Sequence, residues 1–149
     1  MRLSGLALRM AAAAACLLTV CGCRADRAVD SVMADVNPFG WLDRCELRFE
    51  NADTASLFDV SLVVRCGSDT DCDRLSLMLE FEAPDSTLFV ERRDFPLHVP
   101  RKPASASALV TIPYRRGVHL SQTGVYTVTI KPSTVVRGVE AVGFTFEKN

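Results

Sequence analysis

Apolar and polar residues alternate with a period of two along most of the chain after residue 41. Residues 45–49 carry Cys, Leu and Phe at every second position, and the same alternation recurs in residues 58–64 and 75–81. This period gives each segment one dry and one wet face, as in an antiparallel sheet, and no segment shows a helical stripe. Four further short strands are expected at residues 87–94, 108–112, 126–130 and 142–146.

The number and spacing of these segments predict the fold. About seven to eight short strands, separated by turn-rich segments, are typical of a sandwich. We therefore expect one all-β domain, a single antiparallel β-sandwich, over residues 41–149. The connection that contains Pro96 and Pro100 should cross between strands or form a weak edge, because proline cannot donate to a ladder. Tyr126 opens a late strand, and its hydroxyl should either bond back across a sandwich corner or lie at the rim of the core.

The N-terminal segment differs from the rest of the chain in pattern and charge. Two arginines precede an apolar run over residues 10–20, which is shorter than the roughly 20 residues that span a bilayer. This order is typical of a secretory signal. Cys23 follows Gly22, with Val20 three residues before it, and this spacing resembles the bacterial lipobox. We predict a lipoprotein signal peptide at residues 1–22 and lipid attachment at Cys23, the alternative being an ordinary cleaved signal with incidental cysteines.

A lipid on Cys23 would hold the mature protein at a membrane, since two or more acyl chains together anchor stably. Residues 23–40 are polar and mixed in sequence, so we expect a lipidated flexible tether there and structure beginning near Trp41. No later window is apolar enough for a transmembrane helix. The residues after Cys23 contain no block of acids that would suggest export to the cell surface, so we expect a cell-envelope protein that faces the periplasm.

The charge of the chain limits its partners. The formal net charge is −1, which provides no strong field for a polyanion, so nucleic acid is not an expected partner. Basic residues nevertheless occur in pairs that could converge on one surface and contact an acidic protein or anionic lipid headgroups, or could remain separate solvated charges. These pairs are Arg92-Arg93, Arg101-Lys102 and Arg115-Arg116.

The cysteines after the anchor are disulfide candidates, because export leads to an oxidising compartment. Cys66 and Cys72 flank a polar run between two alternating segments, where we expect a hairpin connection, and a disulfide there would contribute about 2 kcal/mol. Cys45 is expected to point into the core or to pair with another chain. A metal site made by Cys66, Cys72 and a histidine is disfavoured, because their spacing is wider than that of a zinc knuckle.

Motifs of catalysis are missing from the sequence, including G-x-S-x-G, S-x-x-K and H-E-x-x-H. The acidic run 69–73 with Glu80 resembles a calcium loop in its spacing, but Arg74 stands where such a loop needs glycine. We therefore expect a protein that is not an enzyme, without catalytic residues, metal or cofactor apart from the covalent N-terminal lipid. An enzyme would need carboxylates such as Glu80 and Glu82 to converge in a cleft.

Several short stretches of the mature chain have counterparts in one known family. They are Trp41 shortly before a strand with Phe49, residues 58–65, the turn at 84–86, Gly124-Val125-Tyr126, and residues 137–143. In these stretches the chain resembles the gliding-motility lipoprotein GldH family of Bacteroidetes. The resemblance implies an outer-membrane lipoprotein with protein partners in the gliding machinery and the secretion apparatus linked to it, and no catalytic activity.

The alternative function is a glycan- or ligand-binding lipoprotein, since sandwiches commonly bind sugars on exposed aromatic side chains. That hypothesis predicts that Trp41 and Tyr114 are exposed together on one face.

Overall fold

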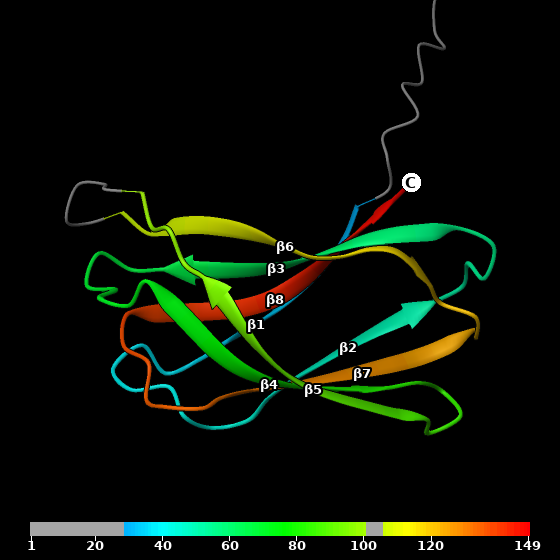
Figure 1. Cartoon of the computed structure of the whole chain (residues 1–149), viewed down its shortest axis with the longest axis horizontal. Coiled ribbons are helices and arrows are strands. Elements are labelled where there is room, and N and C mark those ends of the chain that lie inside the picture. Colours follow the sequence, from blue (N-terminus) through cyan, green and yellow to red (C-terminus); the bar gives the residue numbers. More distant parts are fainter. Residues whose placement is uncertain (1–28, 101–105) are drawn as a thin grey trace, which may run out of the picture.

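The computed structural model describes residues 29–100 and 106–149, which form two antiparallel four-stranded sheets packed face to face (Figure 1). We name them sheet I, with the order β1-β8-β3-β6, and sheet II, with the order β2-β7-β4-β5. The expected all-β sandwich is therefore confirmed. The strands are β1 (Val29–Asp35), β2 (Cys45–Asn51), β3 (Leu57–Cys66), β4 (Arg74–Glu82), β5 (Leu88–Pro96), β6 (Ala108–His119), β7 (Gly124–Pro132) and β8 (Val139–Lys148).

The core lies between the sheets and is filled by the alternating apolar positions of the sequence. In sheet I, Leu62 and Val64 of β3 are fully buried, and in sheet II so are Leu77 and Leu79 of β4. Cys45 at the start of β2 is also buried in this core, as expected. The seven segments predicted as strands are thus β2 to β8.

The eighth strand, β1, lies where a flexible tether was predicted. It pairs along its whole length with β8, so the prediction of a tether over residues 23–40, with structure beginning near Trp41, is wrong from residue 29 onward. The strand escaped prediction because Met33 interrupts the alternation between Val32 and Ala34, both of which pack against the core. Gly143 of β8 permits this pairing, since a Cβ there would lie 2.0 Å from the carbonyl oxygen of Val32.

The connection between Cys66 and Cys72 is not the hairpin that was predicted. β3 belongs to sheet I and β4 to sheet II, so this connection crosses between the sheets. It is held by Gly138, whose carbonyl accepts hydrogen bonds from Gly67 N–H at 2.7 Å and Thr70 Oγ1 at 2.9 Å. Gly138 has φ +81°, and a Cβ on it would lie 2.4 Å from Thr70 Cα, so this position requires glycine.

Two other connections agree with expectation. The proline-containing segment after β5 crosses from the edge of sheet II to β6 at the edge of sheet I. At the corner between β6 and β7, Tyr126 Oη accepts a hydrogen bond from Gln122 N–H at 3.2 Å, which confirms the corner interpretation. The buried Asn51 secures the same corner, because its side-chain amide donates to the carbonyls of Leu120 and Gln122.

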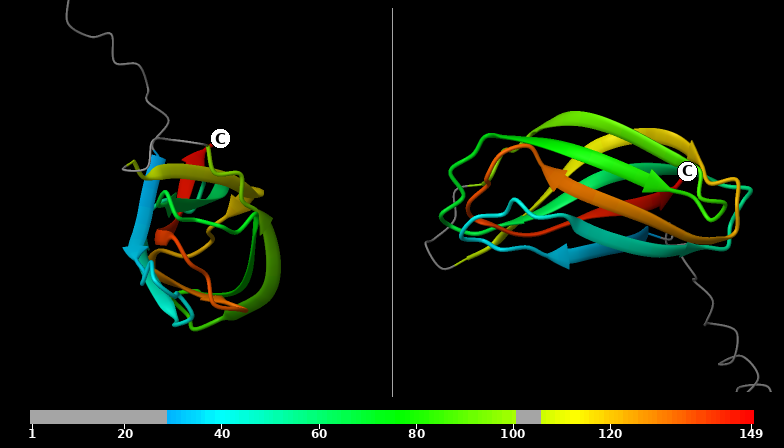
Figure 2. Two further views of the ribbon diagram at one scale, coloured as in Figure 1. Left: turned by 90° about the vertical axis from the view of Figure 1, so that its left-hand side faces the viewer. Right: turned by 90° about the horizontal axis from the view of Figure 1, so that it is seen from below.

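The antiparallel arrangement gives the sandwich two distinct ends (Figure 2). The connections β1–β2, β3–β4, β5–β6 and β7–β8 lie at one end, which we call the Trp41 end. The connections β2–β3, β4–β5 and β6–β7 lie at the other end, together with the start of β1 and the end of β8, and we call this the terminal end. Among the described residues, no helix long and apolar enough to cross a bilayer is found.

Candidate functional site

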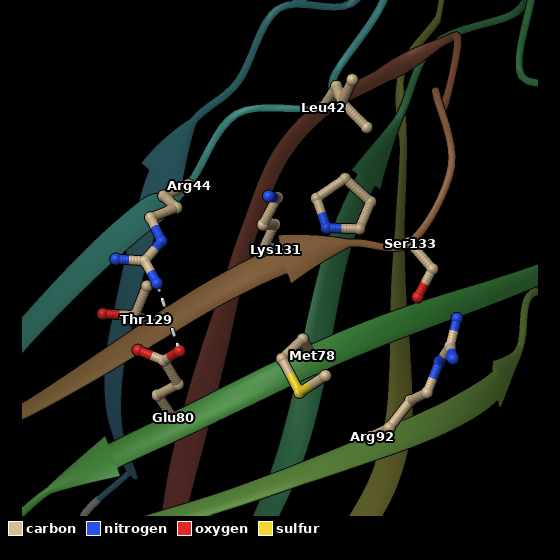
Figure 3. A pocket seen from close by; sticks show the side chains of 9 residues that line it. Leu42, Arg44, Met78, Glu80, Arg92, Thr129, Lys131 and Ser133 are labelled. Atoms are coloured by element: carbon tan, nitrogen blue, oxygen red, sulfur yellow. Dashed lines mark hydrogen bonds and ion pairs between the residues drawn. The ribbon is translucent and has the colours of Figure 1, made fainter.

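A shallow groove of about 460 Å³ lies on the outer face of sheet II (Figure 3). Its side chains come from strands β4, β5 and β7 and from the segments next to β2 and β7, so it lies toward the Trp41 end. The groove is lined by charged, hydroxyl and apolar side chains. The lining residues are Leu42, Arg44, Met78, Glu80, Arg92, Thr129, Lys131, Pro132 and Ser133.

Strand register places two cations of this groove on either side of an apolar residue. Met78 of β4 is paired with Arg92 of β5 on one side and with Lys131 of β7 on the other, which gives a row across three strands. Arg44 and Glu80 form an ion pair with 3.3 Å between Nη2 and Oε1. In the part of the chain that the structure describes, Arg92 and Lys131 have no carboxylate partner. The groove thus holds three cations and one anion, a charge balance that suits an acidic partner.

A second hollow, of about 280 Å³, lies between the sheets at the terminal end, and we call it the inter-sheet pocket. Aromatic rings form much of its wall: Phe81 stacks on Tyr114 with 5.8 Å between ring centroids, and Phe49 stacks on Tyr126 at 5.4 Å. The lining residues are Phe49, Val60, Phe81, Phe89, Tyr114, Arg115, Val118, Leu120, Tyr126 and Phe146.

A charged cluster centred on Tyr114 adjoins the inter-sheet pocket, and Tyr114 and Arg115 belong to both. The Tyr114 hydroxyl donates to Glu91 of β5, and Arg115 Nη2 lies 3.0 Å from the other carboxylate oxygen. The Arg115 guanidinium lies 5.3 Å from the Tyr114 ring centroid and 5.2 Å from that of Phe89, and the Arg93 guanidinium is 5.8 Å from Tyr114. Burial, followed by the hydrogen bond to Glu91, raises the pKa of Tyr114 to about 12.

The dibasic pairs of the sequence therefore converge only in part. Arg93 and Arg115, one from each of two pairs, meet at Tyr114, whereas Arg92 points to the opposite face of sheet II and lines the groove. The pair Arg101-Lys102 lies outside the described residues. Glu91 was missed by sequence reasoning, because no local pattern distinguishes it from any other charge on an edge strand.

The candidate cysteines are found as free thiols. Cys66 is fully buried, and desolvation raises its pKa to about 11, while burial also raises the pKa of the half-buried Cys72 and of the buried Cys45. Both thiols are free in this structure, so the disulfide between Cys66 and Cys72 stays a prediction. Lipid attachment at Cys23 also stays a prediction, because that residue lies outside the described residues.

The aromatic platform that a glycan-binding function would require is not formed by the residues proposed for it. Trp41 is 2% exposed and Tyr114 is 7% exposed. Trp41 pairs through its backbone with Val136, and its indole N–H donates to the Asp43 carbonyl at 2.9 Å, so it serves the core. The prediction that Trp41 and Tyr114 share an exposed face is wrong.

The remaining titratable side chains are spread over the surface. Of the two carboxylates considered for catalysis, Glu80 lines the groove and is paired with Arg44, whereas Glu82 is not among the lining residues. Within residues 29–100 and 106–149, no three side chains of His, Cys, Asp or Glu are grouped so that they could hold a metal ion.

Comparison with known proteins identifies no family for this chain. No family model matches the chain, and neither does any curated protein sequence. A solved structure from work on the carbohydrate-binding modules of the β-sandwich superfamily aligns with 11% sequence identity and a TM-score of 0.35. The alignment covers 78% of this chain and 51% of that one, so this chain spans about half the length of that protein. A similarity this low says nothing about what the present chain binds.

Proposed function

We propose that this protein is a lipid-anchored envelope protein whose β-sandwich domain acts by binding an acidic protein partner in the groove on sheet II. The observation that carries the proposal is the row in which Arg92 and Lys131 flank Met78. Unpaired cations beside an apolar floor suit a segment that presents carboxylates together with apolar side chains. The proposed role is non-catalytic.

The position of the groove fits attachment through Cys23. β1 begins six residues after Cys23, and six extended residues span at most about 20 Å. A lipid on Cys23 would therefore keep the terminal end of the sandwich close to the membrane. The groove lies toward the opposite end, where a partner can reach it. With lipid on Cys23, the terminal end would thus lie nearer to the membrane than the groove does.

The assembly to which the protein belongs is proposed on sequence resemblance alone. The resemblance to the GldH family suggests gliding motility and the linked secretion machinery, at the outer membrane and facing the periplasm. Three of the residues that carry it, Trp41, Tyr126 and Gly138, hold the fold of this chain. They therefore support a shared domain, and the identity of the partner rests on experiment. We do not propose glycan binding on Trp41 and Tyr114, because both are buried.

The test is site-specific photocrosslinking in the native envelope. A photoreactive residue replaces Ser133, which lines the groove, and in a second strain replaces Thr111 on the outer face of sheet I. We expect crosslinked envelope proteins from position 133 that are absent from position 111. Adding Arg92→Glu and Lys131→Glu should abolish them, whereas Arg116→Glu, an exposed cation outside the groove, should not.

The outcomes separate the parts of the proposal. Identical products from both positions, or products that survive the double charge reversal, would refute an acidic partner in the groove. Products that include motility or secretion components support the proposed assembly, and products without them reject that assembly while retaining the groove. A Cys23→Ala strain that keeps the protein in the membrane fraction would refute the anchor.

A further inference from the structure

We infer that the inter-sheet pocket is a binding site for an aliphatic chain with an anionic end group, the chemistry of a fatty acid. This inference goes beyond the proposed function, since the pocket lies at the terminal end and shares no residue with the groove on sheet II.

The pocket is large enough for an alkyl chain, and its lining is apolar enough to favour one. Apolar cavities of about 150 Å³ bind a benzene ring, and this pocket has nearly twice that volume. The Tyr114 hydroxyl is engaged because it donates to Glu91, and the Tyr126 oxygen accepts from Gln122 N–H while its own O–H can still donate. The wall therefore offers a mainly apolar surface.

The walls show an incompletely covered core. Phe49, Phe81, Val118 and Leu120 pack against the core but remain partly exposed, and Phe89 is 48% exposed at the rim. Apolar surface left in water forgoes stabilisation that burial would provide. A ligand that fills the pocket would bury several of these side chains at once, which provides the driving force for binding an alkyl chain.

The charged residues beside the pocket favour a ligand with an anionic end group. Arg115 is the charged residue among those that line the pocket, and its side chain is 44% exposed, so it can reach a head group. Arg93 lies over the same tyrosine ring, and the one carboxylate of this cluster, Glu91, is already bonded to both Tyr114 and Arg115. The cluster has one more positive than negative charge, which favours an anionic end group over a neutral or cationic one.

Two sources could supply this chemistry. One is a free fatty acid in the surrounding solution, and the other is an anionic phospholipid of the nearby bilayer. The mature chain with Cys23→Ala, which carries no lipid of its own, is titrated with decanoate and with decanol by calorimetry. The same titration is repeated in the presence of phosphatidylglycerol vesicles.

We expect decanoate to bind with one site per chain and more tightly than decanol. Arg115→Gln should weaken decanoate about tenfold and leave decanol unchanged, because it removes a charge-assisted contact only. Arg115→Lys should restore part of the affinity, and the neighbouring exposed Arg116→Gln should have no effect. Val118→Phe, which fills the pocket, should weaken both ligands while the thermal midpoint is retained.

A second measurement uses the same Cys23→Ala chain without any substitution in the pocket. In methyl NMR spectra, decanoate should shift the signals of Val60, Val118 and Leu120, and should leave Leu42 and Met78 of the groove unchanged. This readout decides the question even if Val118→Phe does not fold.

The inference is overturned by three results: no saturable binding of decanoate, methyl shifts located in the groove, or equal losses in Arg115→Gln and Arg116→Gln. Competition by the vesicles identifies bilayer lipid as the source, and undiminished decanoate binding identifies a free fatty acid. Either result of that arm supports the pocket, and neither depends on whether a protein partner binds the groove.

Discussion

The two ends of the sandwich are built from the same eight strands, yet the core side chains are covered at one end and partly exposed at the other. At the Trp41 end, Trp41, Phe95, Leu97 and Val139 are each no more than 2% exposed. At the terminal end, Phe81 and Val118 are only partly buried, and a pocket of about 280 Å³ remains between the sheets. Since the strands run through both ends, the difference must come from the connections that cap them.

The connections at the Trp41 end bond to one another. The backbones of Trp41 and Val136 form a pair of hydrogen bonds, at 2.8 and 3.0 Å, and Gly138 N–H donates to the Pro38 carbonyl at 2.8 Å. The turns at the terminal end are also bonded to one another, as where Asp85 N–H donates to Gln122 Oε1 at 3.1 Å and Asn51 donates to the Leu120 and Gln122 carbonyls. The ends differ in the apolar side chains that their connections supply: Trp41, Leu97 and Val136 are buried at the Trp41 end, whereas Leu120 at the terminal end is only partly buried.

The largest loss of stability is expected on removing the Trp41 side chain, which fills the core at the Trp41 end. Trp41→Ala should lower the free energy of unfolding by about 3–5 kcal/mol, because it leaves a large cavity and breaks the indole hydrogen bond to Asp43. Leu120→Ala, at the wall of the inter-sheet pocket, should cost about 1 kcal/mol. Urea denaturation of both variants measures the difference, and equal losses would mean that the two ends do not differ in packing.

The next largest effect is expected at the glycine that links the connections of the Trp41 end. Gly138→Ala should cost about 3 kcal/mol, because it combines a positive φ with a Cβ position 2.4 Å from Thr70 Cα. Gly117 also has a positive φ, +63°, but no atom lies within 4 Å of its Cβ position, so Gly117→Ala should cost about 1 kcal/mol. Thermal unfolding would contradict the steric explanation if both variants were equally affected.

Alkaline pH should sharpen the comparison, since burial raises the pKa of thiols at the Trp41 end and of Tyr114 at the terminal end. Cys66 at the Trp41 end has a pKa of about 11, and Tyr114 at the terminal end of about 12, because burial disfavours their charged forms. These groups ionise at lower pH in the unfolded chain than in the folded one, so the free energy of unfolding is highest below pH 9. It should fall by about 2 kcal/mol between pH 9 and 11 as Cys66 ionises, and by about as much between pH 10 and 12 as Tyr114 ionises.

Substitution assigns these two phases. In unfolding curves of the reduced protein between pH 8 and 12, Cys66→Ala should diminish the loss at lower pH, to which Cys45 and Cys72 also contribute, and Tyr114→Phe should remove the loss at higher pH. A parent protein whose stability does not change over this range would show that neither group stays protonated in the fold.

The smallest effect is expected at the rim of the terminal end. Phe89→Ala should lower the free energy of unfolding by less than about 1 kcal/mol, because the ring is 48% exposed and its contacts are with the Arg115 guanidinium and the Phe81 ring at the rim. Chemical denaturation tests this, and a loss comparable to that of Trp41→Ala would place Phe89 in the closed core.

Alternation of apolar residues predicted most of the strands and the packing of Cys45, because burial on one face of a sheet leaves a period of two in the sequence. β1 was not found in this way, since Met33 interrupts the alternation between Val32 and Ala34. The same pattern could not distinguish a hairpin from the crossing at Cys66, because alternation is local and sheet membership depends on distant partners. The row of Arg92, Met78 and Lys131 also depends on register between strands far apart in the chain.

The pairing of β1 with β8 also determines how the domain would respond to force. β1 is seven residues long and starts at the terminal end, six residues after Cys23. A pull from a membrane-held N terminus along the strand direction would load its ladder in shear, so that the hydrogen bonds would have to break together instead of one by one. A partner held in the groove could then exert tension on the membrane through the sandwich before the edge of sheet I began to peel away.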